Sequence, residues 1–239
     1  MRHQLPERDG TKAAGVTSCV RLDGAPKTTA RAACSGRRLG MRVGVPGNRR
    51  SMAMRGVEEH PIGLRYCEDM VTVEEEAQLE GWLVTLDMEP VVMHGIPSRR
   101  QVGHFGVGYD YQAWTTSQAD RIPRELLDLR VRAASIAAVQ PSTFVEALVT
   151  RYPTGAGIGW HRDASAFGPI VVGVSLCADA VMRFQRQATG GERRVFEQPL
   201  ARRSAYLLSG AARAAWQHSV PAVKQERWSV TFQQVRHTT

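Results

Sequence analysis

No run of about 18 or more apolar residues occurs in this 239-residue chain, so the sequence predicts no membrane-spanning helix. It also lacks a charged start followed by an apolar core of roughly 7–15 residues, so we predict no secretory signal. The four cysteines, Cys19, Cys34, Cys67 and Cys177, form neither a C-x-x-C pair nor a disulfide framework. A reducing cytoplasm is therefore the compartment that we expect.

Net charge is missing from most of the chain. Of its 31 Lys and Arg and 23 Asp and Glu residues, the first 50 positions hold 11 and 3. This leaves 20 of each sign from position 51 onward, so the formal net charge of +8 lies wholly in the first fifth. Net charge therefore gives the remainder no support as a nucleic-acid binder, although local arginine patches can still exist.

Residues 1–56 have almost no aromatic residues and no apolar periodicity, and they are rich in Arg, Gly, Ala, Thr and Pro. We expect this segment to be disordered and residues 57–239 to form the folded domain. A basic arm that touches nucleic acid is one interpretation of the segment. We favour a solvated tail, or a translation start at Met41, Met52 or Met54.

Two helices are predicted in the first half of the folded part. Thr72 followed by Glu75 is a capping-box pattern that opens a helix from Val73 to about Leu86. Pro123 starts a second helix that runs to about Val139. Residues 89–118 between them suggest mixed short strands and loops.

After Pro141 the pattern becomes that of β-strands. Short runs rich in β-branched and aromatic residues alternate with Gly, Pro, Asp or Ala-rich breaks. The runs are EALVTRY, PIVVGVSLC, AVMRFQRQ, RRVFEQ, SAYLLSG, WQHSV and RWSVTFQQV. Seven strands after two helices predict an α+β, mainly β fold: a double-sheet barrel or jelly roll with the N-terminal helices packed on one face.

A histidine and an aspartate, His161 and Asp163, follow a glycine-rich stretch at a spacing of two residues. On an extended chain such residues face the same side, so both can reach one metal ion. The pair alone is a weak signal, because acid–base chemistry or an ordinary polar turn also fits it. His218 in a later predicted strand is the best third ligand. Two histidines and one carboxylate are the ligand set of non-haem Fe(II) oxygenases.

Arg227, on the last predicted strand, extends this pattern. A co-substrate with two carboxylates needs one end chelated by the metal and the other neutralised, and a planar guanidinium matches a carboxylate bidentately. Ser229, two residues further on the same strand face, can add a hydroxyl hydrogen bond. The alternative for Arg227 is a cation on a surface strand.

These residues lie in segments that resemble the AlkB-like family of 2-oxoglutarate/Fe(II)-dependent dioxygenases. The resemblance covers roughly residues 62–237, and its motifs fall in the family's order. They are HFGVGYDY (104–111), YPTGAGIGWHRD (152–163), VSL (174–176), VMRF (181–184), RSAYLLSG (203–210), Arg213, WQHSVP (216–221) and RWSVTF (227–232).

The resemblance implies a double-stranded β-helix that holds Fe(II) through His161, Asp163 and His218, with 2-oxoglutarate bound to the iron and Arg227. Tyr152 would hydrogen-bond the co-substrate. The implied reaction consumes O₂, converts 2-oxoglutarate to succinate and CO₂, and hydroxylates a C–H bond. If that carbon is an N-methyl group, formaldehyde is released, which is the demethylation used in DNA repair.

Three positions depart from the family's pattern. Thr150 stands where the family usually has an asparagine that bonds the co-substrate; a threonine can still hydrogen-bond, with a shorter reach. Gln233 and Gly108 stand where related sequences carry arginines. These changes put the substrate in doubt, while the predicted iron ligands and Arg227 are intact.

Four residues upstream are candidates for substrate contact. Arg99 and Arg100, in a predicted loop, could meet phosphate or an acidic substrate, or simply be solvated. Tyr109 and Tyr111 could stack on a base or pack in a strand core.

We expect a monomer that acts on an alkylated base of DNA or RNA, with 2-oxoglutarate and O₂ as co-substrates. One alternative is a protein side chain or a small metabolite as substrate. A second is a non-catalytic binding module.

Overall fold

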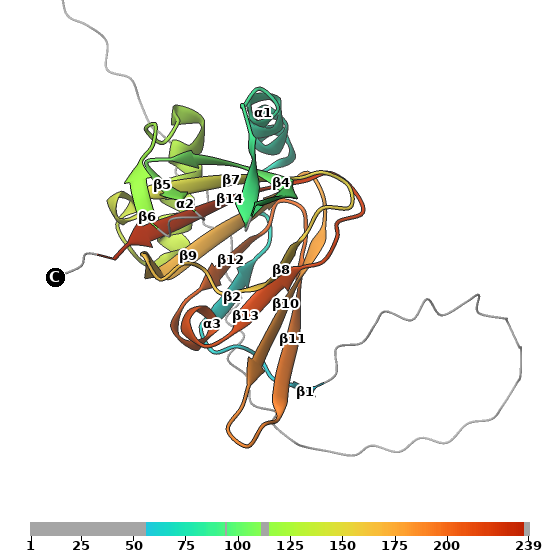
Figure 1. Ribbon diagram of the computed structural model, residues 1–239. Coiled ribbons are helices and arrows are strands. Elements are labelled where there is room, and N and C mark those ends of the chain that lie inside the picture. The colour runs from blue at the N-terminus through green and yellow to red at the C-terminus, as the bar shows by residue number, and fades with distance from the viewer. Residues whose placement is uncertain (1–55, 94, 111–114, 237–239) are drawn as a thin grey trace, which may run out of the picture.

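The computed structural model describes residues 56–93, 95–110 and 115–236. The segment 1–55, most of the expected tail, lies outside the described residues, as does Tyr111. A seven-stranded sheet forms the larger layer, in the order β2-β12-β9-β14-β7-β4-β3 (Figure 1). Its strands are β2 (Leu64–Cys67), β3 (Glu89–Met93), β4 (Ile96–Phe105), β7 (Glu146–Tyr152), β9 (Phe167–Leu176), β12 (Ala205–Leu208) and β14 (Arg227–Val235).

A five-stranded sheet, in the order β1-β11-β10-β13-β8, faces the larger sheet. Its strands are β1 (Val57–Glu58), β8 (Ile158–His161), β10 (Ala180–Gln187), β11 (Arg193–Leu200) and β13 (Gln217–Val220). From β9 to β14 the chain passes back and forth between the two sheets, with β9, β12 and β14 in the larger and β10, β11 and β13 in the smaller, and these strands pair antiparallel within each sheet. This is the expected double-stranded β-helix. A separate hairpin joins β5 (Val107–Asp110) to β6 (Thr115–Gln118).

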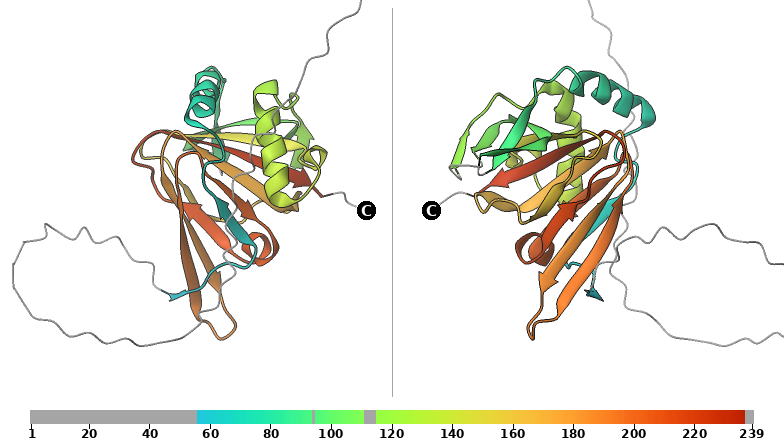
Figure 2. Two further views of the ribbon diagram at one scale, coloured as in Figure 1. Left: turned by 180° about the vertical axis from the view of Figure 1, so that it is seen from behind. Right: turned by 45° about the vertical axis from the view of Figure 1, so that its right-hand side comes forward.

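The helices cover one face of the larger sheet, as predicted (Figure 2). The helices on this face are α1 (Val73–Leu83), η1 (Arg124–Leu126), α2 (Leu127–Ala137) and η2 (Pro141–Thr143), whereas α3 (Gly210–Ala214) lies apart, between β12 and β13. Leu83 of α1 and Leu129 of α2 pack with Val149, Val174 and Phe232 of the sheet. Each such side chain contributes roughly 1.5–3 kcal/mol by burial.

Both predicted helix starts are confirmed, and both helices end earlier than predicted. The capping box is present in full: the Glu75 N–H donates to Thr72 Oγ1, and the Thr72 N–H donates to the Glu75 carboxylate. α2 ends where Ala138 adopts a left-handed conformation, with φ of 55°. None of the helices in the described ranges has the length and apolarity needed to cross a bilayer.

A buried glutamate joins α1 to the sheet. Glu76 is fully buried and accepts a hydrogen bond from the Cys177 N–H at 2.8 Å. It also accepts from Arg202, and it pairs with Arg203 at 3.4 Å. Because Cys177, Arg202 and Arg203 belong to the turns after β9 and β11, this one carboxylate fixes the helix to two turns of the β-helix.

Two of the elements that were not predicted, β8 and α3, bear on the site. The sequence shows only a glycine-rich stretch before His161, but residues 158–161 form β8, which pairs with β13 at the edge of the smaller sheet. α3 is a five-residue helix that no sequence pattern predicted. Both lie beside the predicted metal ligands, as described next.

Candidate metal centre

Glycines allow β8 to approach the end of β13. Gly155 has a φ of 83°, and its N–H donates to the Val223 carbonyl at 2.9 Å. A Cβ on Gly157 would lie 2.6 Å from the Val220 carbonyl oxygen, closer than real Cβ contacts. Only glycine therefore lets the chain pass so close before β8 begins. The result is that His161, at the end of β8, lies directly opposite His218 of β13.

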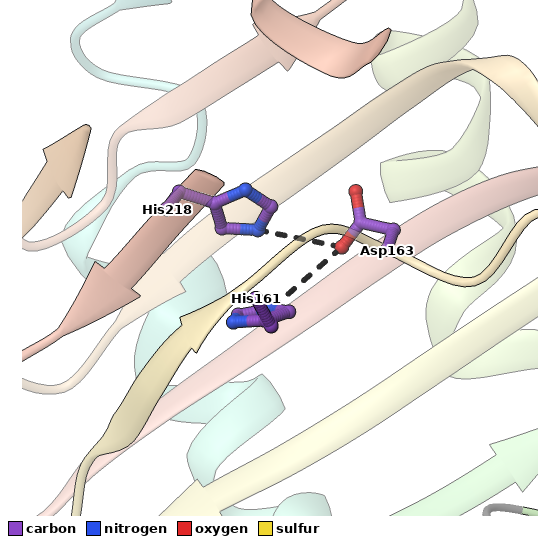
Figure 3. Close-up of side chains that lie close together, drawn as sticks. All are labelled: His161, Asp163 and His218. Carbon is purple, nitrogen blue, oxygen red and sulfur yellow. Dashed lines mark ion pairs between the residues drawn. The ribbon is translucent and has the colours of Figure 1, made fainter. Parts of the chain in front are cut away.

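His161, Asp163 and His218 come together in one cluster, drawn in Figure 3. Asp163 Oδ1 lies 3.9 Å from His161 Nε2 and 3.4 Å from His218 Nε2. The two imidazole rings have centroids 4.3 Å apart. One ligand atom from each residue lies within 4.8 Å of the others. Their separations suit three donors around a single cation.

The electrostatics favour the protonation states that a metal requires. Burial, reinforced by the nearby His218, lowers the pKa of His161 to about 4. Burial alone would favour the protonated form of Asp163, but His218, Arg213 and His161 together hold its pKa below the usual range. The cluster therefore presents a neutral His161 imidazole and a carboxylate at neutral pH, as metal binding demands.

The hydrogen bonds of the cluster are incomplete, which is the main test of whether a metal fits. The His161 Nδ1–H donates to the Gly159 carbonyl at 2.9 Å, which leaves Nε2 as the lone-pair donor. Among the described residues, neither Asp163 Oδ2 nor His218 Nδ1 has a hydrogen-bond partner. Buried polar atoms without partners are rare in folded proteins. A divalent cation between the three side chains would satisfy the carboxylate.

Arg213 of α3 positions the aspartate. Its Nη1 and Nη2 donate to the main-chain carbonyls of Asp163 and Ala164 at 3.3 and 3.0 Å. Its Nε lies 3.5 Å from Asp163 Oδ2. The sequence marked Arg213 only as part of the family pattern. Its role in holding the segment after β8 depends on α3, which the sequence did not reveal.

The cluster lines a cavity of about 410 Å³ between the two sheets. This size is within the range of small-molecule sites. Other residues predicted for the site also line it, from three strands of the larger sheet and from the β5–β6 hairpin: Arg100, Tyr109, Thr150, Tyr152, Arg227 and Ser229. Arg99 and Arg100 lie in strand β4, so the prediction that they occupy a loop is wrong. Arg99 is exposed and does not line the cavity.

A buried cation lines part of the cavity wall. Arg227 is 1% exposed, and its Nε and Nη2 donate to Ser175 Oγ at 3.2 and 2.7 Å. Its guanidinium lies 5.2 Å from the centroid of the Tyr152 ring. Within the described part of the chain, no carboxylate lies within ion-pair distance of it. Burial of an unpaired charge is costly, so this part of the cavity suits an anion.

Strand register places the hydroxyl groups beside this arginine. Ser229 is paired with Thr150 on one side and with Ser175 on the other. All three are buried. The sequence identified Thr150 and Ser229 but not Ser175. Ser175 lies within the VSL motif, so this motif is the sequence feature from which a role for Ser175 could have been predicted.

Two further cavity residues, Tyr206 and Gln233, were not predicted to bind ligand. Tyr206 lies over Gly173, where a Cβ would be 2.2 Å from its ring, and burial raises the pKa of its phenol. Gln233, noted above only as a departure, is 5% exposed, and its Oε1 has no hydrogen-bond partner among the described residues. Tyr109 is buried beside Phe167, with ring centroids 5.5 Å apart.

Comparisons with known proteins identify the family to which this chain is similar. The model of the 2OG-Fe(II) oxygenase superfamily matches residues 72–238. The chain is 27% identical over 172 residues to the Mus musculus protein named tRNA (carboxymethyluridine(34)-5-O)-methyltransferase ALKBH8. It is 28% identical over 187 residues to the Arabidopsis thaliana protein named alkylated DNA repair protein ALKBH8 homolog. Each match covers 69% of this chain.

The chain spans only 25% and 52% of the lengths of these two relatives. Among solved structures, that of OsALKBH1 is similar, with a TM-score of 0.54 and 15% sequence identity. That likeness covers 74% of this chain and 98% of the other. It supports the fold, and the match to the superfamily covers most of the described residues.

Proposed function

The chain belongs to the 2OG-Fe(II) oxygenase superfamily, in its AlkB-like branch, and we propose that it hydroxylates an alkyl group on a nucleic-acid base. Hydroxylation of an N-methyl group would release formaldehyde, so the net reaction would be oxidative demethylation. The observation that carries the proposal is the joint presence of the histidine–aspartate cluster and the buried Arg227 in one cavity. Fe(II) and 2-oxoglutarate are the cofactor and co-substrate of this superfamily.

We propose that His161, Asp163 and His218 hold the iron. Bound iron supplies the activation of O₂ that couples decarboxylation of 2-oxoglutarate to succinate with oxidation of the substrate C–H bond. The chain contributes the ligand geometry: β8 and β13 place the imidazoles opposite each other, and Arg213 fixes the backbone that carries Asp163. Gly159 holds His161 in the tautomer with Nε2 free.

Arg227 would neutralise the carboxylate of 2-oxoglutarate that lies away from the iron. Its two donors to Ser175 hold the guanidinium in one orientation, and the Tyr152 ring supports its face. Thr150 and Ser229 present hydroxyl groups on neighbouring strands that line the same cavity. Because these residues are buried, the ion pair with a carboxylate would form where water screens it little.

The substrate side is proposed from the remaining cavity wall and the relatives. Tyr109 and Arg100, which are 8% and 7% exposed, line the cavity and offer a ring and a guanidinium. The printed names of the two relatives refer to tRNA modification and to repair of alkylated DNA. A flipped or single-stranded base is the form in which such a substrate can enter a pocket. We propose residues 57–239 as the catalytic domain, which contains the whole superfamily match.

A protein side chain or small metabolite is the alternative substrate, and two positions favour it. Gln233 presents a neutral amide to the cavity where the family's pattern has an arginine. At Gly108, a Cβ would lie 2.9 Å from Ser117 Oγ, so the β5–β6 hairpin leaves little room for a long side chain. Both changes remove a cation that could have met a phosphate. A binding module without catalysis would have no need of the intact ligand set.

The direct test is coupled turnover. The full chain with Fe(II), 2-oxoglutarate and O₂ is given single-stranded DNA or RNA bearing N-methylated bases, and succinate and formaldehyde are measured together. We expect formaldehyde in step with succinate for at least one oligonucleotide, and neither product from Asp163→Asn. Succinate without oligonucleotide-dependent formaldehyde would favour the alternative substrates. No succinate under any condition would favour the binding module.

A further inference from the structure

An exposed tryptophan lies next to the proposed iron site on the edge strand of the smaller sheet. Trp160 is 37% exposed and immediately precedes His161 on β8. β8 is the edge strand of its sheet, so Trp160 reaches the rim of the cavity while His161 faces inward.

Arginines and amides surround this tryptophan. The Arg193 guanidinium lies 5.9 Å from the Trp160 ring centroid and donates to the Gln185 side chain. Gln185 in turn donates to Gln217 at 3.0 Å. Arg162, two residues after Trp160, is exposed and also lines the cavity rim. We call these five residues, Trp160, Arg162, Gln185, Arg193 and Gln217, the β8 face.

The arginines of the β8 face differ in their pairing from the other arginines of the smaller sheet. Arg183, Arg186 and Arg194 on β10 and β11 each pair with a carboxylate. Arg162 and Arg193 have no carboxylate within ion-pair distance among the described residues. Two cations without counter-ions beside an exposed indole therefore suit an anionic partner that also has flat rings.

We propose that the β8 face binds single-stranded nucleic acid, with a base stacked on Trp160 and flanking phosphates on Arg162 and Arg193. Base stacking on aromatic side chains combined with cationic contacts to the backbone is the usual chemistry of such sites. A strand held there would pass over the edge of β8 beside the cavity mouth. The inference rests on the proposed function, because it concerns nucleotides that flank the reacting base.

The test is binding rather than turnover. A fluorescently labelled single-stranded oligothymidine is titrated against the full chain with Fe(II) and 2-oxoglutarate under anaerobic conditions. We expect Trp160→Ala to weaken binding roughly 5- to 100-fold and Trp160→Phe to retain most of it. Arg162→Ala and Arg193→Ala should each reduce the slope of log affinity against log salt by about 0.7.

Matched controls lie on the helical side of the molecule. Arg124→Ala removes an exposed arginine at η1, and Leu127→Ala removes an exposed apolar residue at the start of α2. Both should bind like the unaltered chain. Retention of the Fe(II)–2-oxoglutarate absorption band in Trp160→Ala would exclude collapse of the neighbouring site. Equal affinities of Trp160→Ala and Leu127→Ala would overturn the proposal.

Two further outcomes are informative. If oligoglutamate binds with the same dependence on Trp160, the face serves an acidic protein, and the proposal is wrong. Turnover of N-methylated oligonucleotides is measured in parallel. If binding depends on Trp160 but no turnover occurs, the proposed reaction is wrong and the β8 face still binds single-stranded nucleic acid. If turnover occurs but binding does not change in Trp160→Ala, the proposal for the β8 face is wrong and the proposed reaction stands.

Discussion

Two acidic residues of this molecule, Glu76 and Asp163, have opposite surroundings. Glu76 is fully buried and receives hydrogen bonds from a backbone N–H and two arginines. Asp163 is held among two histidines and Arg213 by contacts of 3.4–3.9 Å, and its Oδ2 accepts no hydrogen bond from the described residues. The protein therefore satisfies the hydrogen-bonding oxygens of Glu76, whereas it leaves an oxygen of Asp163 without a partner among the described residues.

The difference separates structural charge from functional charge. A buried carboxylate costs stability unless partners satisfy its oxygens, and Glu76 has such partners from two turns and a helix. Asp163 is kept ionised by its neighbours without being satisfied by them. Arg227 repeats the second pattern, because it is buried with hydroxyl and aromatic neighbours but no carboxylate among the described residues. The same cavity thus holds a carboxylate that is not fully satisfied, Asp163, and a guanidinium without a carboxylate partner, Arg227. The first suits a bound cation and the second a bound anion.

The largest expected effect is on the structural carboxylate. Glu76→Gln keeps the shape but leaves Arg202 and Arg203 without their charge partner, so we expect a loss of about 3–5 kcal/mol in the free energy of unfolding. Chemical denaturation of the full chain measures it. Glu74→Gln, exposed on the same helix turn, should stay within about 0.5 kcal/mol of the unaltered chain. Equal effects of the two variants would remove the distinction drawn for Glu76.

The second largest effect is expected at Arg227, on the affinity for 2-oxoglutarate. Arg227→Met should weaken 2-oxoglutarate binding by about 2–4 kcal/mol, since the carboxylate would lose a buried, bidentate partner. Calorimetric titration of the metal-loaded protein measures it. In the metal-free, co-substrate-free chain the same variant should not lower stability, because it removes an unpaired buried charge. Unchanged affinity for 2-oxoglutarate would show that the co-substrate does not use Arg227.

Metal binding should raise stability only where the cluster is intact. At a free Fe(II) concentration about 100 times the dissociation constant, linkage adds about 2.7 kcal/mol to the folded state. We expect this increase for the unaltered chain in anaerobic thermal unfolding and its absence in Asp163→Asn. Glu76→Gln should show the same increase from its lower starting stability. An increase of equal size in Asp163→Asn would place the metal elsewhere.

The smallest effect concerns a surface pair. The hydrogen bond from Arg132 lowers the pKa of Glu75 to about 2. Because the folded pKa is depressed, its stabilisation is present above the unfolded pKa of about 4.3 and is lost as pH falls towards 2. Since both side chains are more than a third exposed, we expect only about 0.5 kcal/mol. NMR titration should show the Glu75 midpoint rising in Arg132→Ala; an unchanged midpoint would contradict the assignment.

Sequence patterns predicted the local features of the fold well. The capping box at Thr72, the helix after Pro123 and the runs rich in β-branched and aromatic residues after Pro141 each correspond to an observed element. The spacing of His161 and Asp163, and the later His218, also predicted the cluster that the structure brings together. These signals are local, or depend on residue types that few other roles require.

The remaining features depend on contacts between distant segments. β8 is short and preceded by glycines, and it becomes a strand only because β13 pairs with it. α3 has five residues and no side-chain cap, so no periodicity could mark it. Ser175 meets Arg227 through the pairing of β9 with β14. Such register cannot be deduced from either strand alone.

The central claim is that the incomplete cluster at His161, Asp163 and His218 is an iron site that shares its cavity with 2-oxoglutarate. The most direct measurement is an anaerobic titration of the full chain with Fe(II) and 2-oxoglutarate, followed by the weak visible metal-to-ligand charge-transfer band. We predict a saturable band in the unaltered chain, its loss in His161→Ala, and a requirement for more 2-oxoglutarate in Arg227→Met. A folded, unaltered chain that develops no band, or a band that survives in His161→Ala, would contradict the claim.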